Sequence, residues 1–386
     1  MKPRVLFLAQ EVHPIPPLKG AAVEQWIDAV AHLLTRYEAH VISVPHPARP
    51  DEEFDGRVRY HRIRVGRVYN RLFRKITRLD PFSYAERILR YARAINPALI
   101  HIHNAPQFVD GLAGKIPGAR VMLHMHNEKD YPLAGRLDAL VACSDYINRW
   151  FREKGVAAGV FATLPNGVDT VLFSAGRTPQ LASESRARRG IPAGRFVVLF
   201  VGRISPEKGP DLLVRAARHL DRSAFHFVFV GEWPKGDPEK SERVRFADVL
   251  RHDLQGIPCT LVDTVNPADM HLIYSLGDLV VIPSRFEEPF SMVAIEAMSS
   301  GVPVMALRKG GMTEYMVDGQ NATLIDADAS DVQLAGAIQA AAGNSVELHR
   351  MARAARAMVE ARFTWNSVAA QTEALYDRIR ERAAGA

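Results

Sequence analysis

Short apolar runs separated by helical stretches recur along the whole chain, and this alternation constrains the fold more than any other feature. The runs are residues 4–9, 40–44, 99–103, 120–124 and 139–143 in the first half, and 196–201, 226–230, 260–262, 279–282 and 302–306 in the second. Continuous apolar strands alternating with helices are typical of parallel sheets covered by helices. With 386 residues, the chain can form two such domains, each with its own core. The prediction is an α/β fold of two doubly wound domains.

A polar segment separates the two halves. Residues 176–194 contain Pro179, Pro192 and several arginines, and they lack an apolar stripe, which indicates a linker. We therefore expect a first domain at residues 1–175, this linker, and a second domain at residues 195–364. Residues 365–386 have the spacing of a last amphipathic helix. Two doubly wound domains that face each other would bring the carboxyl ends of both strand sets to one cleft.

Two carboxylates, Glu288 and Glu296, bracket a segment that reads as a loop turning into a helix. The residues expected at the start of this helix are Pro289, Phe290, Ser291, Met292 and Val293. The free amides of a helix start, together with the helix dipole, attract anions. Gly301 and the apolar run that follows it indicate a helix stop and a buried strand. The segment therefore predicts a phosphate site at the mouth of a cleft.

A second block, residues 201–209, follows the apolar run at 196–201 and places two cations at a strand end. Gly202 lets the backbone leave the strand, and Arg203 and Lys208 supply the positive charges. The block predicts a clamp for a diphosphate. An ordinary strand-to-helix turn with solvated charges is the alternative reading.

Residues 284–311 resemble the Glu-x7-Glu signature of the retaining, nucleotide-sugar-dependent glycosyltransferases of family 4, which have the GT-B fold, and residues 201–209 match a second block of that family. The resemblance implies two Rossmann-like domains facing a central cleft, with the last helix returning to the first domain. It also implies a nucleotide-diphosphate sugar as donor, with a UDP-sugar favoured. In this reading Arg203 and Lys208 hold the diphosphate, Glu296 the ribose and Glu288 the donor sugar. We expect no cofactor, and no metal, because cations and helix amides already face the phosphates.

The first domain adds further candidates. Gly20 follows a proline-rich loop and precedes a helix near Ala21, but family members often carry a glycine pair where this chain has Lys19-Gly20. The resemblance implies that His126, at the end of a strand, contacts the donor sugar. The secondary candidates are Asn166, in a turn similar to the family's hinge-proximal motif, and Ser284, Gly311 and Glu314 in the second domain. A plain turn also explains the Asn166 segment.

Histidines alternate on two predicted strands, as His101 with His103 and as His124 with His126. Residues two apart on a strand share a face, so each pair could meet a metal. Hydrogen-bonded core histidines are the other reading, and we predict no metal site.

Basic residues are concentrated in one stretch of the first half, and the whole chain has a net charge of +6. They are Arg57, Arg59, Arg62, Arg64, Arg67, Arg71, Arg74, Lys75 and Arg78. Leu72, Phe73, Ile76 and Leu79 would form one face of a helix here. The pattern suits a helix on an anionic membrane surface, a solvated helix packed on its own domain, or a groove for a phosphorylated acceptor. No nucleic-acid-binding motif accompanies the charges.

Only Cys143 and Cys259 are present, in different predicted domains, which favours reduced thiols and a reducing compartment. No signal peptide or membrane-spanning run is recognisable. We therefore expect a cytoplasmic protein, either soluble or peripheral at the inner face of the membrane.

The predicted function is retaining transfer of a sugar to a glycan, lipid-linked or small-molecule acceptor in the synthesis of surface polysaccharide or glycoconjugate. Residues 101–107 and 123–128 also resemble the subgroup that includes spore-coat-associated glycosyltransferases. Two alternatives are a non-catalytic scaffold of the same fold and an enzyme of the glycan phosphorylase type, which would need a lysine that binds pyridoxal phosphate.

Overall fold

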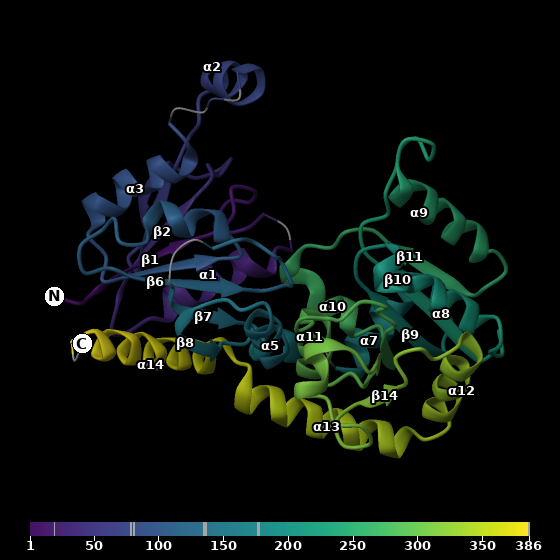
Figure 1. Cartoon of the computed structure of the whole chain (residues 1–386). Coiled ribbons are helices and arrows are strands. Elements are labelled where there is room, and N and C mark those ends of the chain that lie inside the picture. The colour runs from purple at the N-terminus through teal and green to yellow at the C-terminus, as the bar shows by residue number, and fades with distance from the viewer. Residues whose placement is uncertain (19, 78, 80–81, 134–136, 176–177, 385–386) are drawn as a thin grey trace. The chain divides into compact units, whose positions relative to one another are not determined.

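The computed structural model describes residues 1–18, 20–77, 79, 82–133, 137–175 and 178–384. The chain forms two compact units (Figure 1). The first unit consists of Met1–Gly167 and Trp365–Ala386, and the second of Val168–Thr364. The chain thus crosses from the first unit to the second after Gly167 and returns before Trp365.

The first unit is built on a sheet that has eight strands in the described ranges, in the order β3-β4-β2-β1-β5-β6-β7-β8. The strands are β1 (Arg4–Leu8), β2 (Glu38–Ser43), β3 (Glu52–Phe54), β4 (Val58–Arg62), β5 (Leu99–His103), β6 (Arg120–Met125), β7 (Leu137–Ala142) and β8 (Ala158–Thr163). The short β3 runs antiparallel to β4, and the other neighbours are parallel. The central strands are almost wholly buried, as expected for a sheet with both faces covered.

The first unit also contains helices, most of which pack on this sheet. They are α1 (Ala22–Leu33), α2 (Arg67–Tyr69), the π-helix η1 (Asn70–Thr77), α3 (Tyr84–Ile95), the 3-10 helix η2 (Pro106–Phe108), α4 (Val109–Leu112), α5 (Asp145–Glu153) and α14 (Trp365–Ala384). The last helix, yellow in Figure 1, packs on α1 in a shared core. Glu373 of α14 accepts hydrogen bonds from the backbone amides of Thr35 and Arg36 at 2.7 and 2.6 Å. These bonds tie the C-terminal helix to the end of α1.

The second unit contains a parallel sheet, which has six strands in the described part of the chain, in the order β11-β10-β9-β12-β13-β14. The strands are β9 (Phe196–Val201), β10 (Phe225–Val230), β11 (Cys259–Val262), β12 (Leu279–Ile282), β13 (Val304–Leu307) and β14 (Thr323–Ile325). The α-helices are α6 (Thr170–Ala175), α7 (Pro179–Arg188), α8 (Pro210–Ala217), α9 (Glu242–Asp253), α10 (Met270–Tyr274), α11 (Met292–Ser299), α12 (Asp331–Ala342) and α13 (Ser345–Arg362). Three 3-10 helices are η3 (Pro206–Lys208), η4 (Pro267–Asp269) and η5 (Gly310–Glu314).

Each sheet has one point at which the strand order reverses. In the first unit this point lies between β1 and β5, and in the second between β9 and β12. Ligands of open α/β sheets bind outside the carboxyl ends of the strands at such a switch point. The topology therefore singles out the loops after β1, β5, β9 and β12.

The expected linker differs from the structure. Residues 179–188 of the predicted linker form α7 in the second unit. Thr178 caps this helix, Arg186 pairs with Asp278 at 2.8 Å, and Ile191 is buried. The composition suggested a linker because the segment has no apolar stripe. A cap and an ion pair nevertheless order it as a helix.

The crossing after Gly167 has a steric explanation. The φ of Gly167 is not positive, so a left-handed backbone conformation is not the reason for a glycine here. Instead, a Cβ atom on Gly167 would lie 2.4 Å from the ring of Trp365. Trp365 opens the returning helix α14, so the glycine makes room for the returning chain.

Other features bear on the location of the protein. Cys143 is buried in the first unit and Cys259 is half-buried in the second, and neither forms a disulfide. Within the described ranges, no helix combines the length and the apolar character that a membrane crossing requires.

Candidate active site

The loops after β9 and β12 are bound to each other in the second unit. The guanidinium of Arg285 donates to the carboxylate of Asp211 at 2.6 and 2.5 Å and to the Pro206 carbonyl at 2.8 Å. The backbone amide of Arg285 donates to the Glu207 carbonyl at 2.8 Å. These bonds bring the two sequence blocks around Lys208 and Glu288 together at the switch point. Sequence reasoning missed Arg285 and Asp211 as the groups that do this.

Lys208 and Glu288 form an ion pair at this point. Lys208 Nζ lies 2.6 Å from Glu288 Oε1, and the Ser284 hydroxyl donates to the same oxygen at 2.6 Å. Lys208 also lies over the ring of Phe286, 4.7 Å from its centre. The Glu288 side chain is 5% exposed and that of Lys208 is 22% exposed. The sequence analysis assigned the two residues to different parts of a ligand and did not foresee their direct contact.

Arg203 is placed differently from Lys208. It leaves β9 just after Gly202, its side chain is 60% exposed, and its guanidinium lies 3.4 Å from Glu207. Such an exposed pair is weak and open to exchange with another anion. Arg203 is therefore an exposed, weakly paired cation, whereas Lys208 is held by its bond to Glu288.

Helix α11 begins two residues later than predicted. Its first residue is Met292, and its N-cap Ser291 accepts a hydrogen bond from the Ala294 amide at 3.4 Å. Phe290 lies outside the helix and packs on Tyr315 and Phe363 with ring centres 5.2 and 5.4 Å away. The first-turn amides at this helix start are therefore those of Met292 and Val293, while Pro289 and Phe290 precede the helix.

Ser291 has an unusual backbone conformation, with a φ of +75°. A residue other than glycine in this region costs on the order of 1–3 kcal/mol and persists only where its surroundings hold it. Here the buried Phe290 side chain and a hydrogen bond from the Tyr315 hydroxyl to the Phe290 carbonyl hold it. Strain of this kind is concentrated at ligand sites.

The glycine pair after β13 braces the same loop. Gly311 donates its amide to the Glu288 carbonyl at 2.7 Å, and Gly310 donates to the Glu287 carboxylate at 2.5 Å. Gly310 has a φ of +56°, and a Cβ there would lie 2.3 Å from the Glu288 carbonyl oxygen. A side chain at Gly310 would displace Glu288. Glu314, the other candidate on this loop, ends η5.

Glu296 lies on α11 and is bonded to a residue that the sequence analysis missed. The Tyr274 hydroxyl donates to Glu296 Oε2 at 2.7 Å. Burial raises the pKa of Glu296 to about 7, and the bond from Tyr274 opposes this rise. Tyr274 lies on α10, where nothing in the sequence distinguishes it from an ordinary core tyrosine.

The candidates of the first unit also follow strand ends. Gly20 is exposed just before α1, and its neighbour Lys19 lies outside the described residues. His126 follows β6, with its Nε2 3.3 Å from His103 Nδ1. Burial lowers the pKa of His126 to about 4, opposed by a hydrogen bond with the Asn166 side chain. His126 is therefore a neutral ring at pH 7.

The basic stretch between residues 57 and 78 does not form one helix. Its first part is β4, in which the buried Arg62 pairs with Glu53 at 2.8 Å. Its helical part ends at Thr77, before Leu79. Residue Arg78 and the side chains of Arg67, Arg74 and Lys75 lie outside the described part of the structure.

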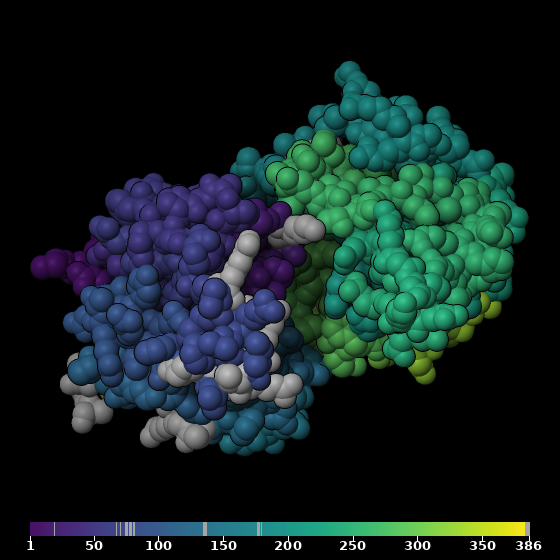
Figure 2. All heavy atoms as spheres, turned by 90° about the horizontal axis from the view of Figure 1, so that it is seen from above, coloured from purple at the N-terminus to yellow at the C-terminus, as the bar shows by residue number. Residues whose placement is uncertain are grey.

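Exposed apolar side chains gather on this segment, which lies on the outer surface of the first unit in Figure 2. They are Val68, Leu72, Ile76, Leu79 and Phe82. The segment is therefore not a helix whose apolar face packs on its own domain. We call residues 67–82 the surface segment.

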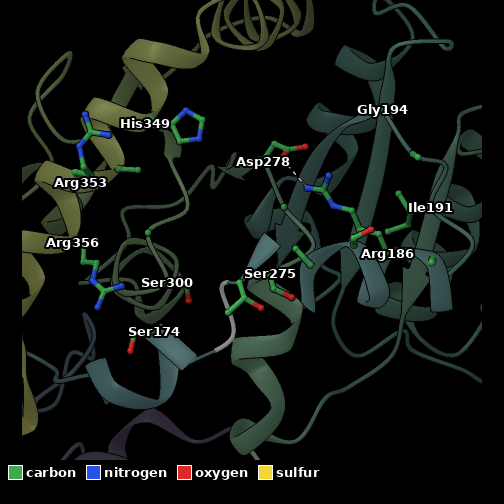
Figure 3. Close-up of a pocket in the computed structure, with 18 residues that line it drawn as sticks. Ser174, Arg186, Ile191, Gly194, Ser275, Asp278, Ser300, His349, Arg353 and Arg356 are labelled. Carbon is green, nitrogen blue, oxygen red and sulfur yellow. Dashed lines mark hydrogen bonds and ion pairs between the residues drawn. The ribbon is translucent and has the colours of Figure 1, made fainter. Parts of the chain in front are cut away.

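A separate cavity of about 740 Å³ lies in the second unit (Figure 3). Its lining includes Arg186 paired with Asp278, and His349 and Arg353 from α13. Gly194 and Asp278 precede β9 and β12, so this cavity adjoins the amino ends of the strands. It is distinct from the Lys208 and Glu288 pair at the carboxyl ends.

The comparisons with known families agree with this geometry. The family "Glycosyl transferases group 1" matches residues 182–358, and the family "Glycosyltransferase Family 4" matches residues 23–172. The lipopolysaccharide 1,2-N-acetylglucosaminetransferase of Salmonella typhimurium is 32% identical over 381 residues, which are 96% of this chain and 97% of that protein. Spore coat protein SA of Bacillus subtilis is 27% identical, and the alignment spans 98% of this chain and 100% of that protein.

Solved structures resemble the fold as a whole. The sucrose-phosphate synthase of Thermosynechococcus elongatus has a TM-score of 0.79 and 21% identity, over 97% of this chain and 99% of its own. Anabaena Alr3699/HepE, in complex with UDP and glucose, has a TM-score of 0.75 and 22% identity, over 97% of this chain and 99% of its own. At these identities the likeness establishes the fold alone.

Proposed function

The chain belongs to the group 1 glycosyltransferases of the GT-B fold, which use nucleotide-sugar donors, and from this premise we propose that it transfers the sugar of a UDP-sugar with retention of anomeric configuration. The observation that carries the proposal is the Lys208, Glu288 and Ser284 cluster at the β9/β12 switch point. It lies on the loops that the fold uses for ligands, and one loop runs directly into the start of α11.

The donor diphosphate binds Lys208, Arg203 and the first-turn amides of α11. Lys208 is held by Glu288 and Phe286 before any ligand arrives, so little reorganisation is needed when negative charge grows on the leaving group. Arg203, exposed and weakly paired, turns from Glu207 to the phosphates. Fixed donors aimed at the departing charge stabilise the transition state more than the ground state.

In this proposal Glu288 holds Lys208 and also binds the donor sugar. Its Oε1 accepts from both Lys208 and Ser284. Among the described residues, no hydrogen-bond donor to its Oε2 is seen, so this oxygen is available to accept from a hydroxyl of the donor sugar. Glu288 thus fixes the ammonium and the sugar relative to each other, which is a positioning effect. It does not act as a nucleophile in this mechanism.

Glu296 accepts from the ribose hydroxyls. Because burial raises its pKa to about 7, hydroxyl donors favour the ionised form that can accept two hydrogen bonds. In the first unit, Gly20, His126 and Asn166 remain predicted donor contacts. A supporting comparison is Anabaena Alr3699/HepE, solved with UDP and with UDP-glucose.

The acceptor proposal rests on the surface segment and on the relatives. Exposed apolar side chains within a basic sequence favour peripheral association with an anionic membrane. The relative from Salmonella typhimurium is named as a lipopolysaccharide 1,2-N-acetylglucosaminetransferase. We therefore propose a lipid-linked or glycan acceptor in surface glycoconjugate synthesis, reached from the cytoplasmic face of the membrane.

The test is a thermal-shift panel of nucleotides and nucleotide sugars, followed by product analysis. A ligand that binds only the folded chain raises its Tm by mass action, and we expect UDP and one or more UDP-sugars to do so. Nuclear magnetic resonance of the product then gives the anomeric configuration. Binding without hydrolysis or transfer would favour the scaffold alternative, and inversion would contradict the retaining mechanism.

A further inference from the structure

Three histidines of adjacent strands meet in the core of the first unit. His101 and His103 share one face of β5 because strand side chains alternate. His124 of β6 is the direct register partner of His103. One ring nitrogen of each lies within 4.8 Å of the corresponding nitrogens of the other two. All three side chains are wholly buried.

The inner nitrogens of these rings are not satisfied by protein groups. His101 Nε2, His103 Nε2 and both ring nitrogens of His124 have no hydrogen-bond partner of good geometry among the described residues. The ring of His126 has its centre 4.2 Å from that of His124, and the ring of Trp26 has its centre 4.8 to 5.5 Å from those of the three histidines. A buried polar atom without a partner costs about 1–3 kcal/mol. Several such atoms in one small region of the core indicate a ligand that can accept their lone pairs.

The outer nitrogens, by contrast, have partners. His101 Nδ1 lies 2.7 Å from the Tyr376 hydroxyl, and His103 Nδ1 lies 3.3 Å from His126 Nε2. If each Nδ1 carries the proton, the unpartnered Nε2 atoms of His101 and His103 keep their lone pairs for a ligand. Metal-binding histidines have this arrangement, with the far nitrogen donating to a fixed acceptor.

We propose that His101, His103 and His124 bind one zinc ion in the core of the first unit. Three imidazoles without a carboxylate select zinc or a similar borderline metal over magnesium, calcium and manganese, which prefer oxygen ligands. A Zn–N distance of about 2.1 Å sets tetrahedral ligand nitrogens about 3.4 Å apart. The rings therefore turn inward when the ion binds.

This inference reverses our sequence-based expectation of no metal, and it goes beyond the proposed transfer reaction. The zinc is held by imidazoles of the first unit, while the diphosphate site lies in the second and uses lysine, arginine and amides. Whether the first unit binds zinc is thus independent of whether the transfer reaction needs an added divalent metal. A transferase that needs no added magnesium or manganese can still contain this zinc.

The ion would also orient His126. With zinc on His103 Nε2, the His103 Nδ1–H donates to His126 Nε2, so the His126 proton resides on Nδ1. That nitrogen is then a donor near the Asn166 side chain. The zinc ligands are positioning residues for the predicted sugar contact of His126.

Metal analysis of the unmodified protein is the first test. Because the ligands are wholly buried, a chelator should not extract the ion from the folded chain. We expect about one zinc per chain after refolding with stoichiometric zinc, and a Tm at least about 5 °C lower after refolding with chelator. Refolding with cobalt should give the intense visible absorption of a tetrahedral site. The proposal is wrong if the refolded protein contains less than about a tenth of an equivalent of zinc per chain, its Tm does not depend on zinc, and cobalt gives no visible absorption.

Matched variants test the ligand set. His101→Gln and His124→Gln should lose the zinc, the metal-dependent part of Tm and the cobalt spectrum. His226→Gln should keep all three, because His226 is a buried strand histidine that bonds Thr260 at 2.9 Å in the second unit. Zinc retained at full stoichiometry in His124→Gln would overturn the assigned ligands. The cobalt spectrum of the unmodified protein decides the question if a variant fails to fold.

Discussion

The two switch points have the same topology and opposite chemistry. At β9/β12, charged side chains from distant segments hold one another, as Arg285 holds Asp211 and Lys208 holds Glu288. Next to the β1/β5 switch point, the side chains that meet are neutral, buried imidazoles on β5 and β6. Developing negative charge is best stabilised by fixed cations, and neutral rings are suited to metal binding or to hydrogen bonding. In our proposal the chemical step therefore depends on the second unit, and we expect substitutions in the two regions to have different effects.

The largest effect is expected at Lys208. Lys208→Ala should lower kcat about 10²- to 10³-fold, because a fixed cation facing the leaving group is lost. It should also lower the free energy of unfolding, because the buried Glu288 loses its partner. Urea unfolding and steady-state kinetics measure the two effects separately.

A double variant distinguishes catalysis from folding at this pair. Lys208→Met with Glu288→Gln removes both charges, so we expect stability to recover while turnover stays low. Arg188→Ala breaks an exposed pair with Glu184 in the same unit and should leave both quantities unchanged. If the double variant recovers turnover, the pair serves folding alone.

The two carboxylates should differ in the step that they affect. Glu296→Gln weakens ribose recognition and should lower UDP affinity about tenfold, whereas Glu288→Gln should lower turnover more than UDP affinity. Calorimetric titration with UDP and single-turnover kinetics provide the two readouts. Equal losses of UDP affinity in both variants would contradict the division of roles.

A pH dependence follows from the raised pKa of Glu296. Its carboxyl titrates near pH 7, and only the ionised form accepts from both ribose hydroxyls, so UDP affinity should rise between about pH 6 and pH 8. In the Glu296→Gln variant the UDP phosphate still titrates but the carboxyl is absent. The measured quantity is therefore the difference between the pH profiles of UDP affinity for the unmodified protein and for this variant.

Tyr274 sharpens this prediction. Its hydroxyl bond lowers the pKa of Glu296, so Tyr274→Phe should move the midpoint of the difference profile to higher pH. If the unmodified protein and Glu296→Gln have identical pH profiles of UDP affinity, Glu296 does not take part in nucleotide binding.

The smallest effect is expected at the surface segment. Leu72→Ser with Ile76→Ser should weaken co-sedimentation with anionic vesicles, because both side chains are exposed. Val249→Ser with Leu261→Ser changes equally exposed apolar residues of the second unit and serves as the control. Binding should weaken as salt screens the basic sequence, since the Debye length is about 10 Å at 0.1 M. If the unmodified protein binds no vesicles at low salt, the acceptor is a soluble molecule.

The strands were predictable from the sequence where burial makes them continuously apolar. All the apolar runs form strands, but β3, β4, β8 and β14 were not among the predicted runs. The strand β4 was missed because its inward residues include Arg62, which is buried through a pair with Glu53. The start of α11 was missed although Ser291 is a typical N-cap residue. Because the apolar Phe290 precedes Ser291, the helix was predicted to begin too early in the sequence.

The composition of the candidate site was predictable, but its internal contacts were not. Lys208 and Glu288 each occur in a recognisable block, and their mutual bond depends on Arg285 binding Asp211. Nothing local in either block encodes that contact. Tyr274 and the convergence of His101, His103 and His124 likewise depend on register and packing, which a single sequence does not reveal.

Calorimetric titration of UDP in the presence of a chelator tests the central claim most directly. If the β9/β12 switch point holds the diphosphate with protein cations and helix amides, the unmodified protein binds UDP without divalent metal. The Lys208→Met and Glu288→Gln double variant should then lose at least about a hundredfold in affinity, and Arg188→Ala should lose none. Unchanged UDP affinity in the double variant, or binding that appears only when magnesium or manganese is restored, would contradict the account.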